Sequence, residues 1–163
     1  MGKHVLQHSH TCNDYADMIY RKAKFQDIPA IVEIAVISVS NNPLPVKIDR
    51  EAMARMAQAC INPAHFAWVA EDENGKVVAV FGACVQKSFW YDKMQCSVLL
   101  YYSLVKGAGI RLIREFANWL KGRSAIKVAT LTLEPEVDPR LIRLFKRLGF
   151  ARESVNLCYV RGI

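Results

Sequence analysis

The sequence predicts an α/β fold in which a mixed, mostly antiparallel twisted sheet is flanked by helices. Two patterns predict it: hairpin-like pairs of apolar segments in the first half, and an amphipathic helical segment between two later strand-like segments. The length of 163 residues, with 52% hydrophobic and 23% charged residues, is typical of one globular domain with a sizeable core. We expect a polar, flexible leader at residues 1–17 and a single domain at residues 18–163.

The first half of the domain is predicted to begin with one strand and two helices. Residues 18–25 alternate apolar and basic side chains, which is typical of a half-buried strand. Pro29 lies in the first turn of a helix that ends before Asn41. Asp49 then begins a second helix that continues to about Cys60.

A hairpin is the clearest local signal in the chain. Two apolar segments, 65–70 and 77–85, flank a turn that contains Asn74 and Gly75, and Asn-Gly supplies the positive φ angles that such a turn requires. A further hairpin turn at 88–93 leads into a strand that begins near Met94.

The second half of the domain is predicted to alternate strands with helices. The predicted elements are an apolar strand over 96–102, a glycine-containing turn at 104–109, an amphipathic helix at 110–120, a strand at 126–133, a helix from Asp138 to a stop at Gly149, and a last strand at 155–161. A helical crossover between the later strands, after the earlier hairpins, makes the predicted sheet mixed.

Cysteine usage and hydropathy indicate a cytoplasmic protein. The cysteines are odd in number, without a CxxC pair, which argues against a disulfide framework and a zinc site: Cys12, Cys60, Cys84, Cys96 and Cys158. No apolar run approaches the roughly 18 residues that span a bilayer, so we expect no membrane association. The leader histidines His4, His8 and His10 lie near Cys12, but no further ligand completes a metal site, and we expect none.

The charge points to a polyanionic partner. The formal net charge is +7, which suits a nucleic acid, a nucleotide cofactor or an acidic substrate. The turn at 104–109 would expose backbone N–H groups at the positive end of a helix dipole, which favours phosphate. Between residues 104 and 124 a single acidic residue, Glu115, accompanies five basic ones: Lys106, Arg111, Arg114, Lys121 and Arg123.

The order of elements, the glycine turn after the fourth strand and the closing run 144–150 (LFKRLGF) together resemble the GCN5-related N-acetyltransferase (GNAT) family. The opening run 21–31 (RKAKFQDIPAI) is similar to that family's first strand and helix start. The resemblance covers residues 18–161. It implies an acetyl-CoA-dependent N-acetyltransferase that acts on an amine of a small molecule, a peptide or a protein.

The resemblance also implies where acetyl-CoA binds. The family pattern Arg/Gln-x-x-Gly-x-Gly/Ala falls on Leu104, Gly107 and Gly109, so that both glycines match and leucine replaces the polar residue. By resemblance, turn amides hold the pyrophosphate and the preceding strand pairs with the pantetheine arm. The residues expected to bind acetyl-CoA are Val98, Leu99, Leu100, Leu104, Val105, Lys106, Gly107, Ala108, Gly109 and Ile110.

The catalytic residues depart from the family pattern. In many relatives a tyrosine of the late helix protonates the leaving thiolate, but the matching residue here is Phe145, and Asp138 replaces the asparagine that commonly opens that helix. Glu134 is a candidate base acting through water. Tyr102 is the candidate acid in preference to Tyr101, since neighbouring strand residues point to opposite faces.

Three hypotheses about function remain open. The chain is an N-acetyltransferase; or it keeps the fold and serves as a binding or structural module, as in some phage particles, which Leu104 and Phe145 favour; or its basic surface binds nucleic acid, which no aromatic and basic strand motif supports. Acceptor specificity is expected from residues 40–49 and 86–93. The aromatic residues Phe89, Trp90 and Tyr91 would line an acceptor pocket or form a homodimer contact.

Overall fold

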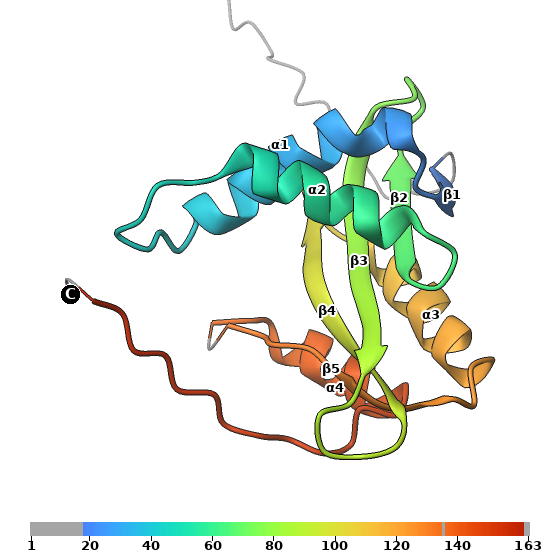
Figure 1. The fold of residues 1–163 in the computed structure, drawn as a ribbon. Coiled ribbons are helices and arrows are strands. Elements are labelled where there is room, and N and C mark those ends of the chain that lie inside the picture. Colours follow the sequence, from blue (N-terminus) through green and yellow to red (C-terminus); the bar gives the residue numbers. More distant parts are fainter. Residues whose placement is uncertain (1–17, 135, 162–163) are drawn as a thin grey trace, which may run out of the picture.

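The computed structural model describes residues 18–134 and 136–161, and it has one five-stranded sheet with helices on both faces (Figure 1). Its elements are β1 (Ile19–Lys22), the 3₁₀ helix η1 (Phe25–Asp27), α1 (Ile28–Ser40), α2 (Arg50–Ile61), β2 (Phe66–Glu71), β3 (Val77–Lys87), β4 (Met94–Ser103), α3 (Ala108–Lys121), β5 (Ile126–Thr130) and α4 (Pro139–Arg147). The predicted leader at 1–17, with its histidines and Cys12, lies outside the described residues.

The sheet is mixed, as the sequence predicts. The strands lie in the order β1-β2-β3-β4-β5, and the first four pair with their neighbours in antiparallel fashion. The last pair, β4 and β5, is parallel because α3 carries the chain back across the sheet between them. The α/β fold class is therefore confirmed.

The two faces of the sheet carry separate hydrophobic clusters. On one face Ile31 and Ile34 of α1 pack with Val69 and Val80 of the sheet. On the other face the core consists of side chains from α3, α4 and the sheet, including Phe66, Phe81, Leu112, Ile113, Phe116 and Phe145. Figure 1 shows α1 and α2 in front of the strands and α3 behind them.

The predicted start of the second helix and the predicted first hairpin are both present. The Asp49 side chain accepts a hydrogen bond from the backbone N–H of Ala52 at 2.8 Å and so caps α2. In the β2–β3 turn the Asp72 side chain accepts bonds from the backbone of Asn74 and Lys76, both at 2.9 Å, while Gly75 has φ +74°. These local bonds fix the register in which Val69 faces Val80.

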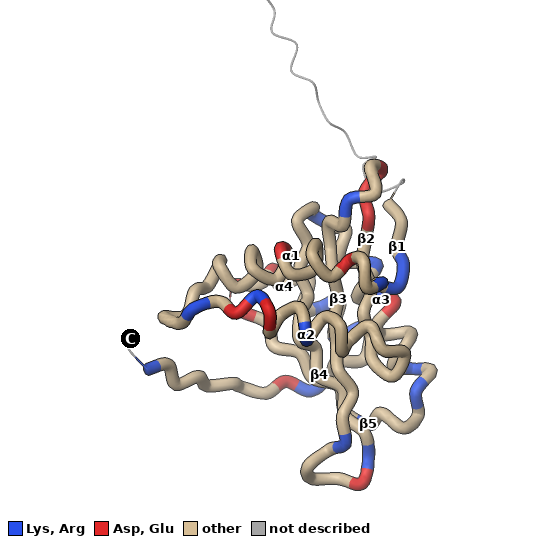
Figure 2. Tube along the Cα trace, turned by 45° about the horizontal axis from the view of Figure 1, so that its top comes forward, with Lys and Arg blue, Asp and Glu red and all other residues tan. Residues whose placement is uncertain are grey.

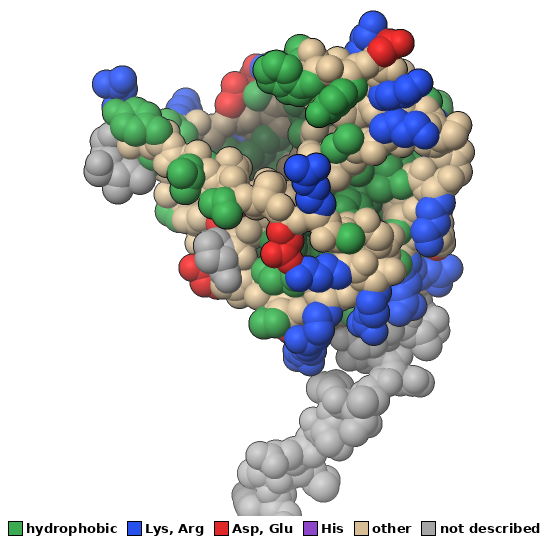
Figure 3. Space-filling view, turned by 90° about the horizontal axis from the view of Figure 1, so that it is seen from below, with side chains coloured by type: hydrophobic (Ala, Val, Ile, Leu, Met, Phe, Trp, Pro, Cys, Tyr) green, Lys and Arg blue, Asp and Glu red, His purple; other side chains and the backbone are tan. Residues whose placement is uncertain are grey.

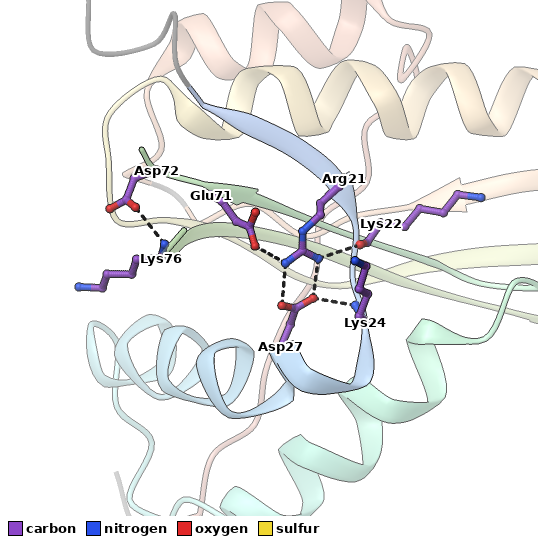
Figure 4. Close-up of polar contacts among 7 residues, drawn as sticks. All are labelled: Arg21, Lys22, Lys24, Asp27, Glu71, Asp72 and Lys76. Carbon is purple, nitrogen blue, oxygen red and sulfur yellow. Dashed lines mark hydrogen bonds and ion pairs between the residues drawn. The ribbon is translucent and has the colours of Figure 1, made fainter. Parts of the chain in front are cut away.

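An ion network joins β1, η1 and β2 (Figure 4). The Arg21 guanidinium donates to the two carboxylate oxygens of Asp27 at 2.7 and 2.9 Å, and also to Glu71. Asp27, whose side chain is only 5% exposed, accepts a further bond from the Lys24 backbone N–H at 2.7 Å. The bonds from Arg21 lower the pKa of Asp27, and the bonds to Asp27 and then Glu71 raise the pKa of Arg21.

Several element boundaries differ from the predicted ones. β1 ends at Lys22 because η1 begins at Phe25, α3 begins at Ala108 rather than at residue 110, and β5 ends at Thr130 rather than at residue 133. None of the helices in the described parts of the chain combines the length and apolar character needed to cross a membrane.

The predicted last strand at 155–161 is wrong. Residues 151–160 have no regular secondary structure and run away from the sheet, with Val155, Leu157 and Tyr159 exposed by 89%, 89% and 85% (Figure 1). The alternation of apolar and polar residues is typical of a strand, but a strand also needs a neighbour to pair with. No strand of the described chain pairs with this segment.

Candidate functional site

The parallel strands β4 and β5 separate along their length. Their pairing ends where Ser97 faces Thr130, although β4 continues to Ser103. Among the strands that the structure describes, none pairs with this edge of β4 after Ser97. The main-chain groups on the open edge can therefore hydrogen-bond a ligand laid along the strand.

A bulge lies within this open part of β4. Gly82 of β3 faces Leu100 and Ala83 faces Val98, so that Leu99 has no residue opposite to it and is 45% exposed. A bulge bends a strand and redirects its side chains, and such irregularities are frequent beside active sites. The bulge falls within the predicted pantetheine-binding stretch Val98 to Leu100.

The paired part of the junction is tightly closed. Cys96 lies between Val85 of β3 and Ala129 of β5 and is 0% exposed. Burial raises the pKa of the Cys96 thiol to about 12. This cysteine is therefore a packing residue at the point where β4 and β5 begin to separate.

The turn before α3 has the left-handed backbone expected of its first glycine. Gly107 has φ +87° at the N-cap of α3, a conformation that favours glycine. The backbone N–H of Ala108 donates to Val105 at 3.2 Å, and that of Ile110 donates to Gly107 at 3.1 Å. A phosphate at this turn would share these amides or use those of Gly107 and Gly109.

Gly109 is required by packing. It is buried, and a Cβ atom at this position would lie 2.6 Å from the Tyr101 Oη and 2.8 Å from the Tyr101 Cε2. Tyr101 also packs against Phe81 and Phe145, with ring centroids at 5.4 and 6.4 Å. Burial raises the pKa of Tyr101 to about 12, so the hydroxyl stays neutral at physiological pH. Tyr101 thus holds the start of α3 against the sheet.

The basic residues around the turn are more dispersed than the sequence suggests. Lys121 and Arg123 lie at the far end of α3, about 20 Å from its start for a helix of 14 residues. Arg123 donates to the Pro63 carbonyl at 3.0 Å and stacks over Trp119. Arg111 stacks over Tyr20. Figure 2 shows Lys and Arg on many elements rather than at the start of α3 alone.

Both predicted catalytic residues, Tyr102 and Glu134, contact the start of the connection between α1 and α2. Asn41, at the end of α1, donates from Nδ2 to the Tyr102 Oη at 2.6 Å. The next residue, Asn42, donates from Nδ2 to a carboxylate oxygen of Glu134 at 3.3 Å. Tyr102 packs on the α1 face of the sheet and Tyr101 on the α3 face, which confirms that they point in opposite directions.

Sequence reasoning assigned residues 40–49 to acceptor specificity and did not identify the two asparagines as partners of these side chains. The contacts span 61 and 92 residues of sequence. The Asn-Asn pair itself signals only the end of a helix.

The late helix offers no proton donor at the family's tyrosine position. Phe145 is 3% exposed and packs edge-on against Phe150, with ring centroids at 5.4 Å. Asp138 caps α4 by accepting from the backbone N–H of Arg140 at 2.8 Å. Bonds from the Arg140 side chain and backbone lower the pKa of Asp138 to about 2. Asp138 is therefore a capping residue.

The aromatic loop, defined as Phe89, Trp90 and Tyr91, lies between β3 and β4. It precedes the first residue of β4, whereas the turn at 104–109 follows the last one. A strand of 10 residues is about 33 Å long, so the loop and the turn are at opposite ends of β4. The loop is thus remote from the predicted acetyl-CoA site.

Comparisons of structure identify the fold. A predicted acetyltransferase from Clostridium acetobutylicum, solved with acetyl-CoA, is similar at TM-score 0.66 and 21% identity, over 88% of this chain and 96% of that one. Glucosamine-6-phosphate N-acetyltransferase from Arabidopsis thaliana is similar at TM-score 0.62 and 15% identity, over 88% of this chain and 98% of that one. An aminoglycoside acetyltransferase from an uncultured soil metagenomic sample, in complex with sisomicin, is similar at TM-score 0.62 and 16% identity, over 88% and 95% of the two chains.

The chain has the fold of the GCN5-related N-acetyltransferases, as the resemblance implies. At the level of sequence, neither the models of protein families nor the curated proteins match it.

Proposed function

We propose that the protein transfers an acetyl group from acetyl-CoA to an amine. The observation that carries this proposal is the open edge of β4 from Val98 to Ser103, which leads to the left-handed turn at Gly107. An edge of free main-chain groups suits the amides of pantetheine, and a helix N-terminus suits a pyrophosphate. The GNAT fold and the acetyl-CoA in the Clostridium acetobutylicum protein support this assignment.

The proposed binding residues fall into two groups. Val98, Leu99 and Leu100 would pair with pantetheine through their main chain, because β5 no longer pairs with β4 after Ser97. The turn residues would face the pyrophosphate: Leu104, Val105, Lys106, Gly107, Ala108, Gly109 and Ile110. Leu104 is 41% exposed and offers no polar group, so we expect binding to depend on backbone amides.

Tyr102 is proposed as the acid that protonates the thiolate leaving group. Its oxygen accepts the hydrogen bond from Asn41, and the phenol therefore keeps its own proton to donate elsewhere. Glu134 is proposed as the base that removes the amine proton through water, with Asn42 holding one carboxylate oxygen. Because β4 and β5 are parallel, both residues lie toward the end of the sheet at which the acetyl-CoA turn is found.

The first experiment measures binding. We expect acetyl-CoA and CoA to raise the melting temperature and to give a calorimetric signal that weakens when Gly107→Val removes the left-handed turn. Gly75→Val is the matched control, because Gly75 also has a positive φ, +74°, but lies in the β2–β3 hairpin. Absence of a thermal shift and of heat with the unaltered protein would contradict the proposal.

The second experiment measures thiol release over a panel of amines. Tyr102→Phe should lower kcat by about 10²-fold and leave the KM for acetyl-CoA near its original value, since the hydroxyl that it removes is proposed to act on the thiolate and not to bind the cofactor. Tyr91→Phe is the control, because Tyr91 is exposed at the other end of β4. Equal rates for the two variants would exclude Tyr102 as the acid.

A second candidate function is binding of CoA without transfer. Phe145, which is 3% exposed, favours it, because the side chain at the family's usual tyrosine position has no proton to give to a thiolate. CoA binding without thiol release for any amine would select this alternative.

A further inference from the structure

Two cysteines from different elements meet between α2 and the sheet. The Sγ atoms of Cys60 in α2 and Cys84 in β3 are 3.3 Å apart. The two residues are 24 positions apart in the sequence, so their spacing does not signal the pair. A disulfide holds its two sulfurs at about 2.05 Å, so a movement of about 1.3 Å would join α2 to β3.

The other buried cysteine, Cys96, lies on the opposite face of the sheet. Cys96 faces Val85 in the register of β3 and β4, and both side chains belong to the hydrophobic cluster under α3 and α4. Neighbouring side chains of a strand point to opposite faces, so Cys84 points to the face that α1 and α2 cover. The remaining described cysteine, Cys158, is exposed in the segment after α4. Among the described cysteines, Cys60 and Cys84 are thus each other's partners.

The space beside Cys84 allows the two sulfurs to approach. Gly82 lies two residues before Cys84, on the same face of β3, and is buried. A Cβ atom at Gly82 would meet nothing within 4 Å. Cys60 lies in the last turn of α2, one residue before the helix ends at Ile61. This turn therefore has room to settle toward the strand.

The helix α2 has few buried side chains of its own. Of its residues, all of which the structure describes, Cys60 alone is buried, while Ala57 and Ile61 are half-buried against the sheet. At the other end of the helix, an exposed ion pair joins Arg50 to Glu33 of α1, and such pairs contribute little. A covalent bond at Cys60 would therefore be the strongest link between α2 and the sheet.

Cys84 is the sulfur that an oxidant from solvent reaches first. Cys60 is 5% exposed, whereas Cys84 is half-buried. The strand β3 ends three residues later, at Lys87, on the face of the molecule that Figure 3 shows, where charged and hydrophobic side chains are open to solvent. Burial raises the pKa of the Cys60 thiol, which keeps it protonated and slow to react with an oxidant.

We propose that Cys60 and Cys84 form a redox site, at which hydrogen peroxide oxidises the two thiols to a reversible disulfide. The peroxide first oxidises the Cys84 thiol to a sulfenic acid and releases one water. The Cys60 sulfur then attacks the Cys84 sulfur, so that the S–S bond forms as the S–O bond breaks, and the leaving hydroxide takes the Cys60 proton as a second water. The two thiols lose two electrons, which the peroxide gains. A dithiol reductant restores both thiols by exchange.

The first test detects the bond itself. A full-length variant with Cys12→Ser and Cys158→Ser keeps only Cys60, Cys84 and Cys96. It is reduced, treated with hydrogen peroxide, unfolded, alkylated and digested. Mass spectrometry should find a peptide pair that is joined through Cys60 and Cys84 and is released by dithiothreitol. Cys96 should be recovered as the alkylated thiol, because it lies on the other face of the sheet.

The second test measures stability in both redox states. A disulfide between residues 24 positions apart restricts the unfolded chain, so the oxidised protein should melt about 5–10 °C above the reduced protein. Cys84→Ala should abolish this difference. Cys96→Ala is the matched control, because it removes a buried thiol of the same sheet and should leave the difference in place. Each variant is compared with itself in two redox states, so a loss of stability from the substitution alone cancels.

Two results would overturn the redox site. One is the absence of the linked peptide, whether Cys84 stays reduced or is oxidised beyond the sulfenic acid, since Cys60 would then not reach its partner. The other is a difference in melting temperature that persists in Cys84→Ala, since the stabilisation would then come from elsewhere. Neither result bears on acetyl transfer, which the thiol-release assay measures separately.

Discussion

The sheet has a closed half and an open half. In the closed half β2 and β3 are paired on both sides, and the Arg21, Asp27 and Glu71 network joins β1 to the start of α1. In the open half β4 pairs with β3 alone after Ser97, and β5 has one unpaired edge within the described residues. Apart from the outer edge of β1, the unpaired main-chain groups of the sheet in the described residues therefore lie in the half where the cofactor is proposed to bind.

The largest expected effect comes from breaking the closed half. Asp27→Ala leaves Arg21 with one carboxylate fewer and the Lys24 N–H without its acceptor, so the free energy of unfolding should fall by about 3 kcal/mol. Urea unfolding measures the loss. Asp92→Ala is the control, because the exposed pair between Asp92 and Lys87 should contribute less than about 0.5 kcal/mol. Equal losses would mean that the Asp27 network does not stabilise the fold.

A smaller effect is expected at the boundary between the halves. Gly109→Ala places a Cβ atom against the Tyr101 ring and should cost about 2 kcal/mol. Gly82→Ala in β3 is the control, since a Cβ atom there meets nothing within 4 Å. Tyr101→Leu should relieve much of the cost in a double-mutant cycle. Additive losses in that cycle would contradict the proposed contact.

The smallest effect is a pH dependence of the closed half. Folding lowers the pKa of Asp27 below its ordinary 3.8, so the folded state binds fewer protons than the unfolded state in this range. The contribution of the ionised Asp27 carboxylate to the free energy of unfolding is complete above the pKa that Asp27 has in the unfolded state. It is lost as the pH falls through the pKa that Asp27 has in the folded state. The stability difference between the unaltered protein and Asp27→Asn should therefore shrink below about pH 4, as measured by urea unfolding. A difference that stays constant to pH 2 would contradict the assignment.

The sequence predicted the elements whose signals are local. The Asn74-Gly75 turn, the Asp49 cap and the amphipathic helix after the glycine turn each depend on neighbours within a few residues, and each is present in the structure. The prediction of a last strand at 155–161 was wrong because a local signal is not enough to form a strand. Its alternation is local, but strand formation depends on a pairing partner that the sequence does not specify.

The candidate site was harder to predict because its contacts are remote in sequence. Glycine at position 109 fits a phosphate-binding motif, yet the structure adds a packing reason, the Tyr101 ring, that comes from a different element. The hydrogen bond between Asn41 and Tyr102 crosses from one helix to a distant strand. Only the fold shows that these side chains meet.

The burial of Cys96 provides a way to measure how often the junction of β4 and β5 opens. A thiol that is 0% exposed, with a pKa of about 12, reacts with an alkylating reagent only when the strands around it part. The rate of its modification at neutral pH therefore counts opening events, and the exposed Cys158 serves as a fast internal standard. The rate at which Cys96 is modified thus reports how often β4 and β5 separate transiently at the point where their pairing ends.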